Sequence, residues 1–230
     1  MTAGGPLRQV VAAMPGRLSN GSAAQGTPES GKTFLGPLFQ DALEARVEAP
    51  VLLDSDANAS QRGILKEDAH IGNAALFVLS SALNFASCTD HEITQGRTLA
   101  FGDLGVLFSG VGNETLDGLL SGKGLLRFAQ TRGLELERIE ALWSEPLDAP
   151  SRPEVVQAFA TAIVTAVSAV AVTLDPESVY FVGRLSPLAE EVLPEVRSRL
   201  AHSLPSVPAI RVVPQVIGLS VAQGAAQGTN

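Results

Sequence analysis

The sequence contains very little cysteine and histidine. Cys88 is the single cysteine among 230 residues, which excludes an intramolecular disulfide and a cysteine-based zinc site. The three histidines, His70, His91 and His202, do not have the spacing of metal ligands. We therefore expect no metal site and no bound cofactor, and we expect Cys88 to be a buried structural thiol.

Basic residues are also few, and they form no cluster. Sixteen Lys and Arg residues against 24 Asp and Glu residues give a formal net charge of −8 and an isoelectric point near 4.9. A DNA-binding surface usually needs clustered Lys and Arg side chains to neutralise phosphates. We therefore expect that this chain does not bind DNA by itself.

Aromatic residues make up only 5% of the chain, whereas 45% is apolar and 17% charged, a globular composition. One apolar stretch, Val155 to Leu174, is about long enough to cross a bilayer. It is rich in Ala and Thr, contains Gln157 and has no basic flank beyond Arg152, so we expect a buried core helix and no membrane span. The N-terminus does not have the pattern of a signal peptide, and a cytoplasmic location is expected.

Apolar periodicity and turn residues predict strands and helices in alternation, which is typical of an α/β protein. A loose tail is expected over residues 1–9 and a Gly- and Ser-rich loop over residues 17–33. The expected strands are Val10–Met14, Val51–Leu53, Ala74–Ala82, Asn84–Cys88, Ile93–Leu99, Val179–Val182 and Ile210–Val213. The expected helices are Pro37–Val47, 57–68, Leu116–Ala129, Leu136–Trp143, the long apolar helix that ends at Leu174, a helix from Ser186 and a last helix over 217–226.

Polar residues at the helix ends support these boundaries. Asp54, Ser55 and Asp56 supply an N-cap for the helix over 57–68. Ser151 and Glu154 have the spacing of a capping box that opens the long apolar helix. Asp175–Pro176 is expected to end that helix, and Ser186–Pro187 to cap the next one.

Residues 26–33, GTPESGKT, match the GxxxxGK[ST] pattern of phosphate-binding loops, in which Lys32 would pair with phosphates and Thr33 with Mg²⁺. A P-loop joins a strand directly to a helix. Here the expected strand ends at Met14, and Gly36–Pro37 prevents an immediate helix. A solvated loop is therefore favoured, with nucleotide binding through Lys32 and Thr33 as an alternative.

Five further segments, in order along residues 10–226, together carry a resemblance that none carries alone. They are VVAAMPG at Val10–Gly16, APVLLDSDANA at Ala49–Ala59, FGDLGV at Phe101–Val106 with Gly96 upstream, PESVYFVGRLS at Pro176–Ser186, and GLSVAQGAA at Gly218–Ala226. The chain resembles the ROK family of repressors and sugar kinases. The resemblance implies an α/β, actin-like ATPase fold of the sugar kinase and hsp70 type. It implies a remnant of the N-terminal lobe over 10–71 and a nearly whole C-terminal lobe over 72–230.

The resemblance also implies roles for individual residues. Asp56 stands at the position of the kinases' general base, which takes the proton of the attacking sugar hydroxyl. Ser55 stands where the family has an Asn that binds sugar hydroxyls, and Asp103 where it has a Glu that accepts hydroxyl hydrogen bonds. A structural alternative is that residues 54–56 only cap the next helix and that Asp103 lies in a polar turn.

Several positions depart from the kinase pattern. Ser80–Asn84 replaces a GTGIG phosphate loop and loses three glycines, Val106 replaces a zinc-binding His, and Arg184 replaces a glycine near the adenine site. The chain begins fourteen residues before Pro15, which leaves no room for the family's DxGGT loop or a helix-turn-helix. We therefore expect either a fragment of a longer regulator or a remnant reading frame.

These features together favour a non-catalytic sugar-sensing and dimerisation module of a ROK-type transcriptional regulator. Its expected partners are a sugar ligand and a second copy of the chain, because the strands Val10–Met14 and Val51–Leu53 need neighbours. The alternatives are a weak kinase that phosphorylates a hexose or N-acetylhexosamine with ATP, and a P-loop nucleotide-binding protein.

Overall fold

The structure, a computed structural model, describes residues 8–14, 18–19, 22–23, 36–68, 70–96, 100–144 and 149–213. Its largest unit is a five-stranded mixed sheet with the strand order β7-β6-β5-β8-β9. The strands are β5 (Ala74–Leu79), β6 (Leu83–Thr89), β7 (Glu92–Ile93), β8 (Ser178–Val182) and β9 (Ala209–Val213). β5, β6 and β7 form the predicted antiparallel meander, whereas β8 and β9 run parallel to β5. Two of the predicted bounds are wrong: the strand expected over Ala74–Ala82 ends at Leu79, and the strand expected over Ile93–Leu99 ends at Ile93, because residues 94–96 are outside the ladder with β6.

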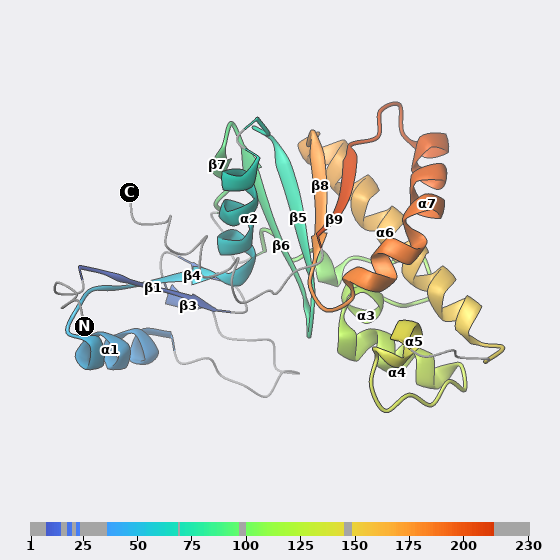
Figure 1. Ribbon diagram of the computed structural model, residues 1–230, viewed down its shortest axis with the longest axis horizontal. Helices are drawn as coiled ribbons and strands as arrows, with labels where there is room; N and C mark the ends of the chain where they lie inside the picture. Colours follow the sequence, from blue (N-terminus) through green and yellow to red (C-terminus); the bar gives the residue numbers. More distant parts are fainter. Residues whose placement is uncertain are drawn as a thin grey trace.

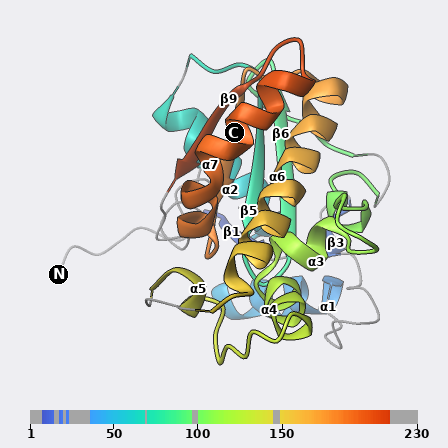
Figure 2. The same ribbon diagram turned by 90° about the vertical axis from the view of Figure 1, so that its right-hand side faces the viewer.

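Both faces of this sheet are covered by helices, which explains the continuous apolar sequence of β5. Alternate side chains of a strand point to opposite faces. Leu76 and Val78 therefore pack with α2 (Asp56–Glu67), and Phe77 and Leu79 pack with helices on the other face. Those helices are α3 (Leu116–Leu120), α4 (Gly122–Thr131), α5 (Ala141–Ser144), α6 (Arg152–Leu174) and α7 (Ser186–Ser203), and they lie on the far side of the sheet from α2 (Figures 1 and 2).

The N-terminal part forms a smaller unit. β1 (Val10–Met14) pairs in parallel with β4 (Val51–Ser55), and α1 (Gly36–Val47) contributes Leu43 and Val47 to the apolar cluster on this pair. β2 (Leu18–Ser19) and β3 (Ser22–Ala23) form a short antiparallel pair inside the segment expected to be a loop. The apolar runs thus correctly predict β1, β4 and α1.

The long apolar stretch forms α6. By length and composition this helix could cross a membrane, yet its inner face lies in the core, where Phe159, Ile163 and Val167 are buried. Asp175 ends the helix in the left-handed conformation, with φ 46°, as expected for a helix C-terminus. The predicted core helix is therefore confirmed for this inner face, whereas the outer face of α6 is not buried.

The two predicted caps of the C-terminal helices are wrong. Ser151 has helical backbone angles, and its side chain makes no cap hydrogen bond. Glu154 instead forms an ion pair with Arg132 at 2.9 Å, so the carboxylate does not fold back on the helix start. Ser186 lies within α7, whose N-cap is Leu185 without a side-chain cap bond.

One predicted helix is divided in two in the structure, and another is shorter than predicted. The expected helix over Leu116–Ala129 breaks at Ser121, whose Oγ donates to the carbonyl of Asp117 at 2.7 Å and accepts from the N–H of Gly124 at 3.1 Å. Within Leu136–Trp143 the helix begins only at Ala141, and the apolar side chains of Leu136 and Ile139 before it are buried in an irregular segment. The expected helix over 217–226, residues 1–7 of the tail, residues 97–99 of the third strand, and Lys32 and Thr33 lie outside the described residues.

Candidate functional site

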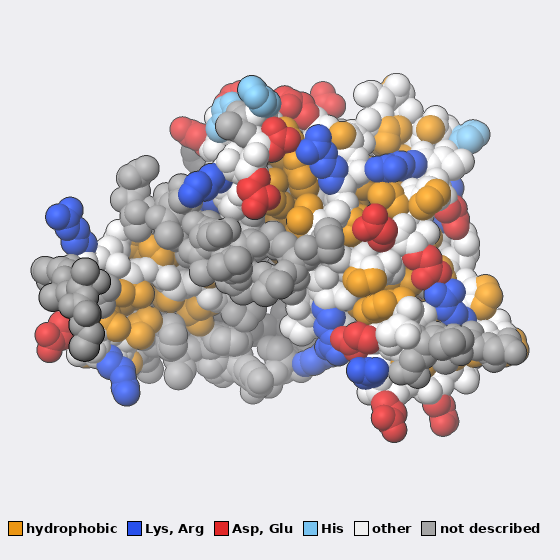
Figure 3. Space-filling model, viewed as in Figure 1, with side chains coloured by type: hydrophobic (Ala, Val, Ile, Leu, Met, Phe, Trp, Pro, Cys, Tyr) orange, Lys and Arg blue, Asp and Glu red, His pale blue; other side chains and the backbone are white. Residues whose placement is uncertain are grey.

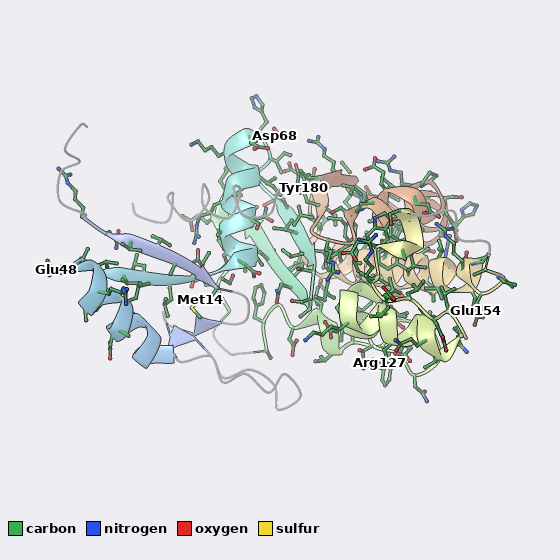
Figure 4. All side chains as sticks on the ribbon, turned by 60° about the horizontal axis from the view of Figure 1, so that its bottom comes forward. Met14, Glu48, Asp68, Arg127, Glu154 and Tyr180 are labelled. Carbon is green, nitrogen blue, oxygen red and sulfur yellow. The ribbon has the colours of Figure 1, made fainter. Side chains whose placement is uncertain are left out.

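The candidate site lies where β4 ends and α2 begins. Ser55 is the last residue of the strand, and Asp56 is the first residue of the helix. Met14 ends β1 as the register partner of Ser55, and it lies beside the start of α2 (Figure 4). The site is therefore at the carboxyl end of two parallel strands, where ligands of α/β proteins commonly bind.

Asp54 and Ser55 hold the first turn of α2 in place. The Oγ of Ser55 accepts a hydrogen bond from the N–H of Asn58 at 3.0 Å, so Ser55 is the N-cap. Oδ1 of Asp54 accepts from the N–H of Ser55 at 2.8 Å and from Nδ2 of Asn58 at 3.2 Å, and its Oδ2 pairs with Arg62. The predicted cap is confirmed, and the hydroxyl of Ser55 still has its proton to donate.

Asp56 is in a different environment. Its Oδ1 is buried and has no hydrogen-bond partner among the described residues. Burial raises the pKa of the Asp56 carboxyl from 3.8 to about 6, partly offset by the backbone N–H groups of Ala57 and Asp56 itself. A buried acceptor without a partner is costly, so this oxygen can gain a hydrogen bond from a polar ligand such as a sugar hydroxyl.

Asp103 lies on a different element from Asp56. It precedes the 3-10 helix η2 (Leu104–Val106) and follows Gly102, which has a φ of 79°. Both η2 and α2 lie against β6, so one strand borders both elements. Leu104 packs with the cluster on the α6 side of the sheet, however, whereas α2 packs on the opposite face.

The turn between β5 and β6 is held by hydrogen bonds to α3 and α4. The N–H of Leu83 donates to Oδ1 of Asp117 at 2.7 Å, and the carbonyl of Ser80 accepts from the N–H of Gly122 at 2.7 Å. A phosphate-binding turn offers free backbone N–H groups to the anion. Here a carboxylate already takes one of them, and its charge would repel a phosphate.

Gly183 and Arg184, which follow β8, are also fixed by contacts with distant segments. Gly183 has a φ of 113°, and a Cβ at this position would lie 2.5 Å from the carbonyl oxygen of Leu79. Arg184 makes two contacts with the carboxylate of Glu140, one of them 2.8 Å from Nη2 to Oε2. The hydrogen bond from Arg184 lowers the pKa of Glu140, as expected for a charged pair of this geometry.

Cys88 is buried, as predicted. Its sulfur accepts from Nε2 of Gln61 at 3.4 Å and lies 3.6 Å from the carbonyl of Gly72. Burial raises the pKa of this thiol. Within the described ranges, no group of three or more His, Cys, Asp or Glu side chains is placed to hold a metal ion.

Four residues that shape these regions were not predicted from the sequence. Asn58 and Arg62 follow Asp54 at intervals of four and eight residues, a spacing that could have identified them as its helical neighbours. Asp117 and Glu140 reach their partners across 34 and 44 residues, and no local pattern predicts such contacts.

A sequence model described as the ROK family matches residues 3–228. The chain is similar to a ROK hexokinase from Thermus thermophilus, with a TM-score of 0.69 and 20% identity over 82% of this chain and 68% of that one. It is also similar to a ROK family protein from Streptococcus pneumoniae TIGR4 in complex with sucrose, with a TM-score of 0.75 and 17% identity over 93% and 78% of the two chains.

The fold of this chain is about as similar to that of a transcriptional regulator. The chain matches a ROK family transcriptional regulator, a homolog of the E. coli Mlc protein, with a TM-score of 0.72 and 17% identity over 95% of this chain and 61% of that one. A comparison with curated proteins found no match. At these identities, the solved structures show the fold.

Proposed function

The chain belongs to the ROK family and has its actin-like ATPase fold, and from this premise we propose that it is a non-catalytic, sugar-sensing and dimerising module of a ROK-type transcriptional regulator. The family contains both sugar kinases and regulators. The choice between these roles therefore depends on the site of this chain.

The observation that carries the proposal of a sugar ligand is the buried Oδ1 of Asp56, which has no hydrogen-bond partner within the described ranges. A sugar hydroxyl that donates to this oxygen would remove the cost of an unsatisfied acceptor. The hydroxyl of Ser55, which already caps α2, and the carboxylate of Asp103 are the other proposed sugar contacts. The sucrose complex of the pneumococcal ROK protein supports this class of ligand.

Two features support a site without kinase activity. Phosphoryl transfer depends on preorganised donors that hold the nucleotide, and a general base alone is not sufficient. In this chain the carboxylate of Asp117 accepts a hydrogen bond from the N–H of Leu83, in the turn between β5 and β6. Arg184 forms an ion pair with Glu140. We propose that these contacts prevent productive binding of ATP.

The proposal also covers whether the chain contacts DNA, whether it pairs with a second copy, and where in the cell it is located. Lys and Arg side chains are scattered among acidic ones on the face seen in Figure 3, which supports a module that does not contact DNA itself. We propose a cytoplasmic homodimer in which residues 10–71 are the remnant of the N-terminal lobe and residues 72–230 the C-terminal lobe. In this division α2 belongs to the first lobe by sequence and packs on the sheet of the second.

One observation favours a second candidate, a weak sugar kinase. A carboxyl with a pKa of about 6 can accept a proton near neutral pH, as a general base must. The P-loop alternative rests on Lys32 and Thr33, which lie outside the described residues, and it stays a prediction from sequence.

Calorimetric titration with hexoses and N-acetylhexosamines tests the proposal. We expect one class of sugar to bind, Asp56→Asn to weaken binding at least about tenfold, and Asp90→Asn, at an exposed turn, to leave it unchanged. Coupled ATP turnover that Asp56→Asn abolishes would establish the kinase instead. ATP binding that Lys32→Ala removes and Asp56→Asn leaves intact would establish the P-loop protein.

A further inference from the structure

Arg62 is the basic residue nearest in the chain to Asp56, and it lies in the second turn of α2. Its guanidinium pairs with Oδ2 of Asp54, and the two side chains are largely buried, with exposed fractions of 21% and 14%. An ion pair on an open surface contributes little, but the loss of one partner of a buried pair leaves an uncompensated charge. Without Arg62, the carboxylate of Asp54 would therefore lie next to the candidate site with no cation to balance it.

The ion pair belongs to a polar row along α2, which consists of Asp54, Asn58 and Arg62. These residues follow one another at intervals of four, which places them on one side of the helix. Helical side chains lean toward the N-terminus, so Asn58 and Arg62 both reach back to Asp54. The Oδ1 of Asp54 accepts from Nδ2 of Asn58 at 3.2 Å and from the N–H of Ser55 at 2.8 Å. The polar row therefore fixes the backbone at Ser55, immediately before Asp56.

Asp56 is on a different side of the helix from this row. It precedes Asn58 by two residues, which is about 200° around an α-helix. The residues that share its side, three, four and seven positions further on, are uncharged: Ala59, Ser60 and Gly63. The polar row therefore balances the charge of Asp54 and places no cation against Asp56, whose Oδ1 has no partner among the described residues.

Few other titratable groups lie on the elements that pack against α2, which are β1, β4, β5, β6 and β7. Besides Asp56, the titratable side chains of these strands and of α2 are Asp54, Arg62, Lys66, Glu67, Cys88 and Glu92. Lys66, Glu67 and Glu92 are exposed, so water screens their charges. Cys88 is a buried thiol whose pKa is raised by burial, which keeps it neutral. Within this set, Asp54 and Arg62 are the partly buried charges that can act on Asp56.

We infer that Arg62 is a positioning residue of the sugar site: its pair with Asp54 fixes the turn before Asp56 and balances a neighbouring like charge, so that a sugar hydroxyl donates to the ionised carboxylate of Asp56. The inference rests on the proposed function and adds a determinant of the same site. An ionised carboxylate is the stronger hydrogen-bond acceptor. An unbalanced carboxylate nearby would favour the protonated form of Asp56, whose pKa burial already raises to about 6. Sugar binding should therefore weaken below about pH 6, and at a higher pH once Arg62 is removed.

An NMR titration of the Asp56 carboxyl carbon, with no ligand present, tests the role of Arg62 independently of the sugar. We expect Arg62→Gln to raise the pKa of Asp56 by at least about 0.5 pH units, and Arg62→Lys, which keeps the charge, to restore most of the difference. Arg152→Gln is the matched control. Arg152 lies at the start of α6, on the other side of the sheet from α2 (Figures 1 and 2), is 26% exposed and pairs with Glu191 at 2.8 Å. Its loss removes a comparable ion pair and should leave the pKa of Asp56 unchanged.

A second variant covers the case in which Arg62→Gln does not fold. Asp54→Asn keeps an oxygen that can accept from Ser55 and Asn58 but removes the like charge, so it should lower the pKa of Asp56. An unchanged pKa of Asp56 in folded Arg62→Gln, an equal rise in Arg152→Gln, or an unchanged or raised pKa in Asp54→Asn would each overturn the inference.

Calorimetric titration with glucose and N-acetylglucosamine between pH 5 and 8 connects this effect to binding. Arg62→Gln should weaken binding at least about twofold more at pH 6 than at pH 8, where Asp56 is ionised in both proteins, and Arg62→Lys should reduce this difference. A loss of affinity that is the same at every pH would contradict the inference. If neither sugar binds while the pKa of Asp56 responds as expected, the proposed ligand is wrong and the effect of Arg62 on Asp56 stands.

Discussion

At the scale of single residues, the environment of a side chain decides its role more than its identity does. Asp54 and Asp56 are two residues apart and chemically identical. Asp54 is paired with Arg62 and accepts hydrogen bonds from neighbouring donors, whereas Oδ1 of Asp56 is buried and has no partner in the part of the chain that the structure describes. The first carboxylate therefore stabilises the start of α2, and the second is available to a ligand.

The raised pKa of Asp56 makes protein stability depend on pH. Because its pKa is higher in the folded state, the contribution of Asp56 to stability is fully present below about pH 4 and is lost as pH rises through about 6. We expect Asp56→Asn to stabilise the protein at pH 7 by about 1–3 kcal/mol and to have little effect at pH 4. Thermal unfolding of both proteins across this range, with Asp90→Asn as the control, measures the difference. A gap that does not change with pH would contradict the assignment.

Gly183 is required where β8 meets the helix that follows it. Both its φ of 113° and the nearby Leu79 carbonyl exclude a side chain. We expect Gly183→Ala to destabilise the protein by at least about 3 kcal/mol in urea unfolding. Gly112 also has a positive φ, of 51°, but has open space around its Cα, so Gly112→Ala should cost only about 1 kcal/mol. If both variants lost the same free energy of unfolding, the close approach of Gly183 to the carbonyl of Leu79 would not contribute to stability.

At the scale of helices and strands, local patterns predict most of the fold. Apolar runs correctly indicate β1, β4, β5, β8, β9 and α6, because each of these elements buries a continuous or periodic apolar surface. The residue types at a helix start are a weaker signal. Ser121 caps α4 within a stretch predicted as continuous helix, whereas Ser151 has the pattern of a cap and makes no cap bond.

These two serines give a direct test of helix capping. Ser121→Ala removes a hydroxyl that accepts from Gly124 and donates to Asp117, so we expect a loss of about 1 kcal/mol. Ser151→Ala removes no cap bond, and its effect should stay below about 0.5 kcal/mol. Chemical unfolding of the two variants in parallel decides between the observed caps and the sequence pattern. The reverse order of effects would support the capping box of Ser151.

At the scale of the whole molecule, some contacts join residues that are far apart in sequence. The position of Asp56 could be predicted, because its segment resembles a known family and lies at the end of an apolar strand. The contacts of Asp117 with Leu83 and of Glu140 with Arg184 could not be predicted, because they join segments that meet only when the sheet and its helices pack. The sequence therefore predicts the fold and the place of Asp56 after the strand β4, but not the contacts made by the β5–β6 turn and by Arg184.

Native mass spectrometry of the chain, incubated with MgATP and hexoses or N-acetylhexosamines, tests the central claim most directly. Because Asp56 is free to accept a hydroxyl while Asp117 and Arg184 are engaged, we predict a complex with sugar, no nucleotide adduct and no sugar phosphate. Release of a sugar phosphate, or a chain that binds ATP and no sugar, would contradict the account.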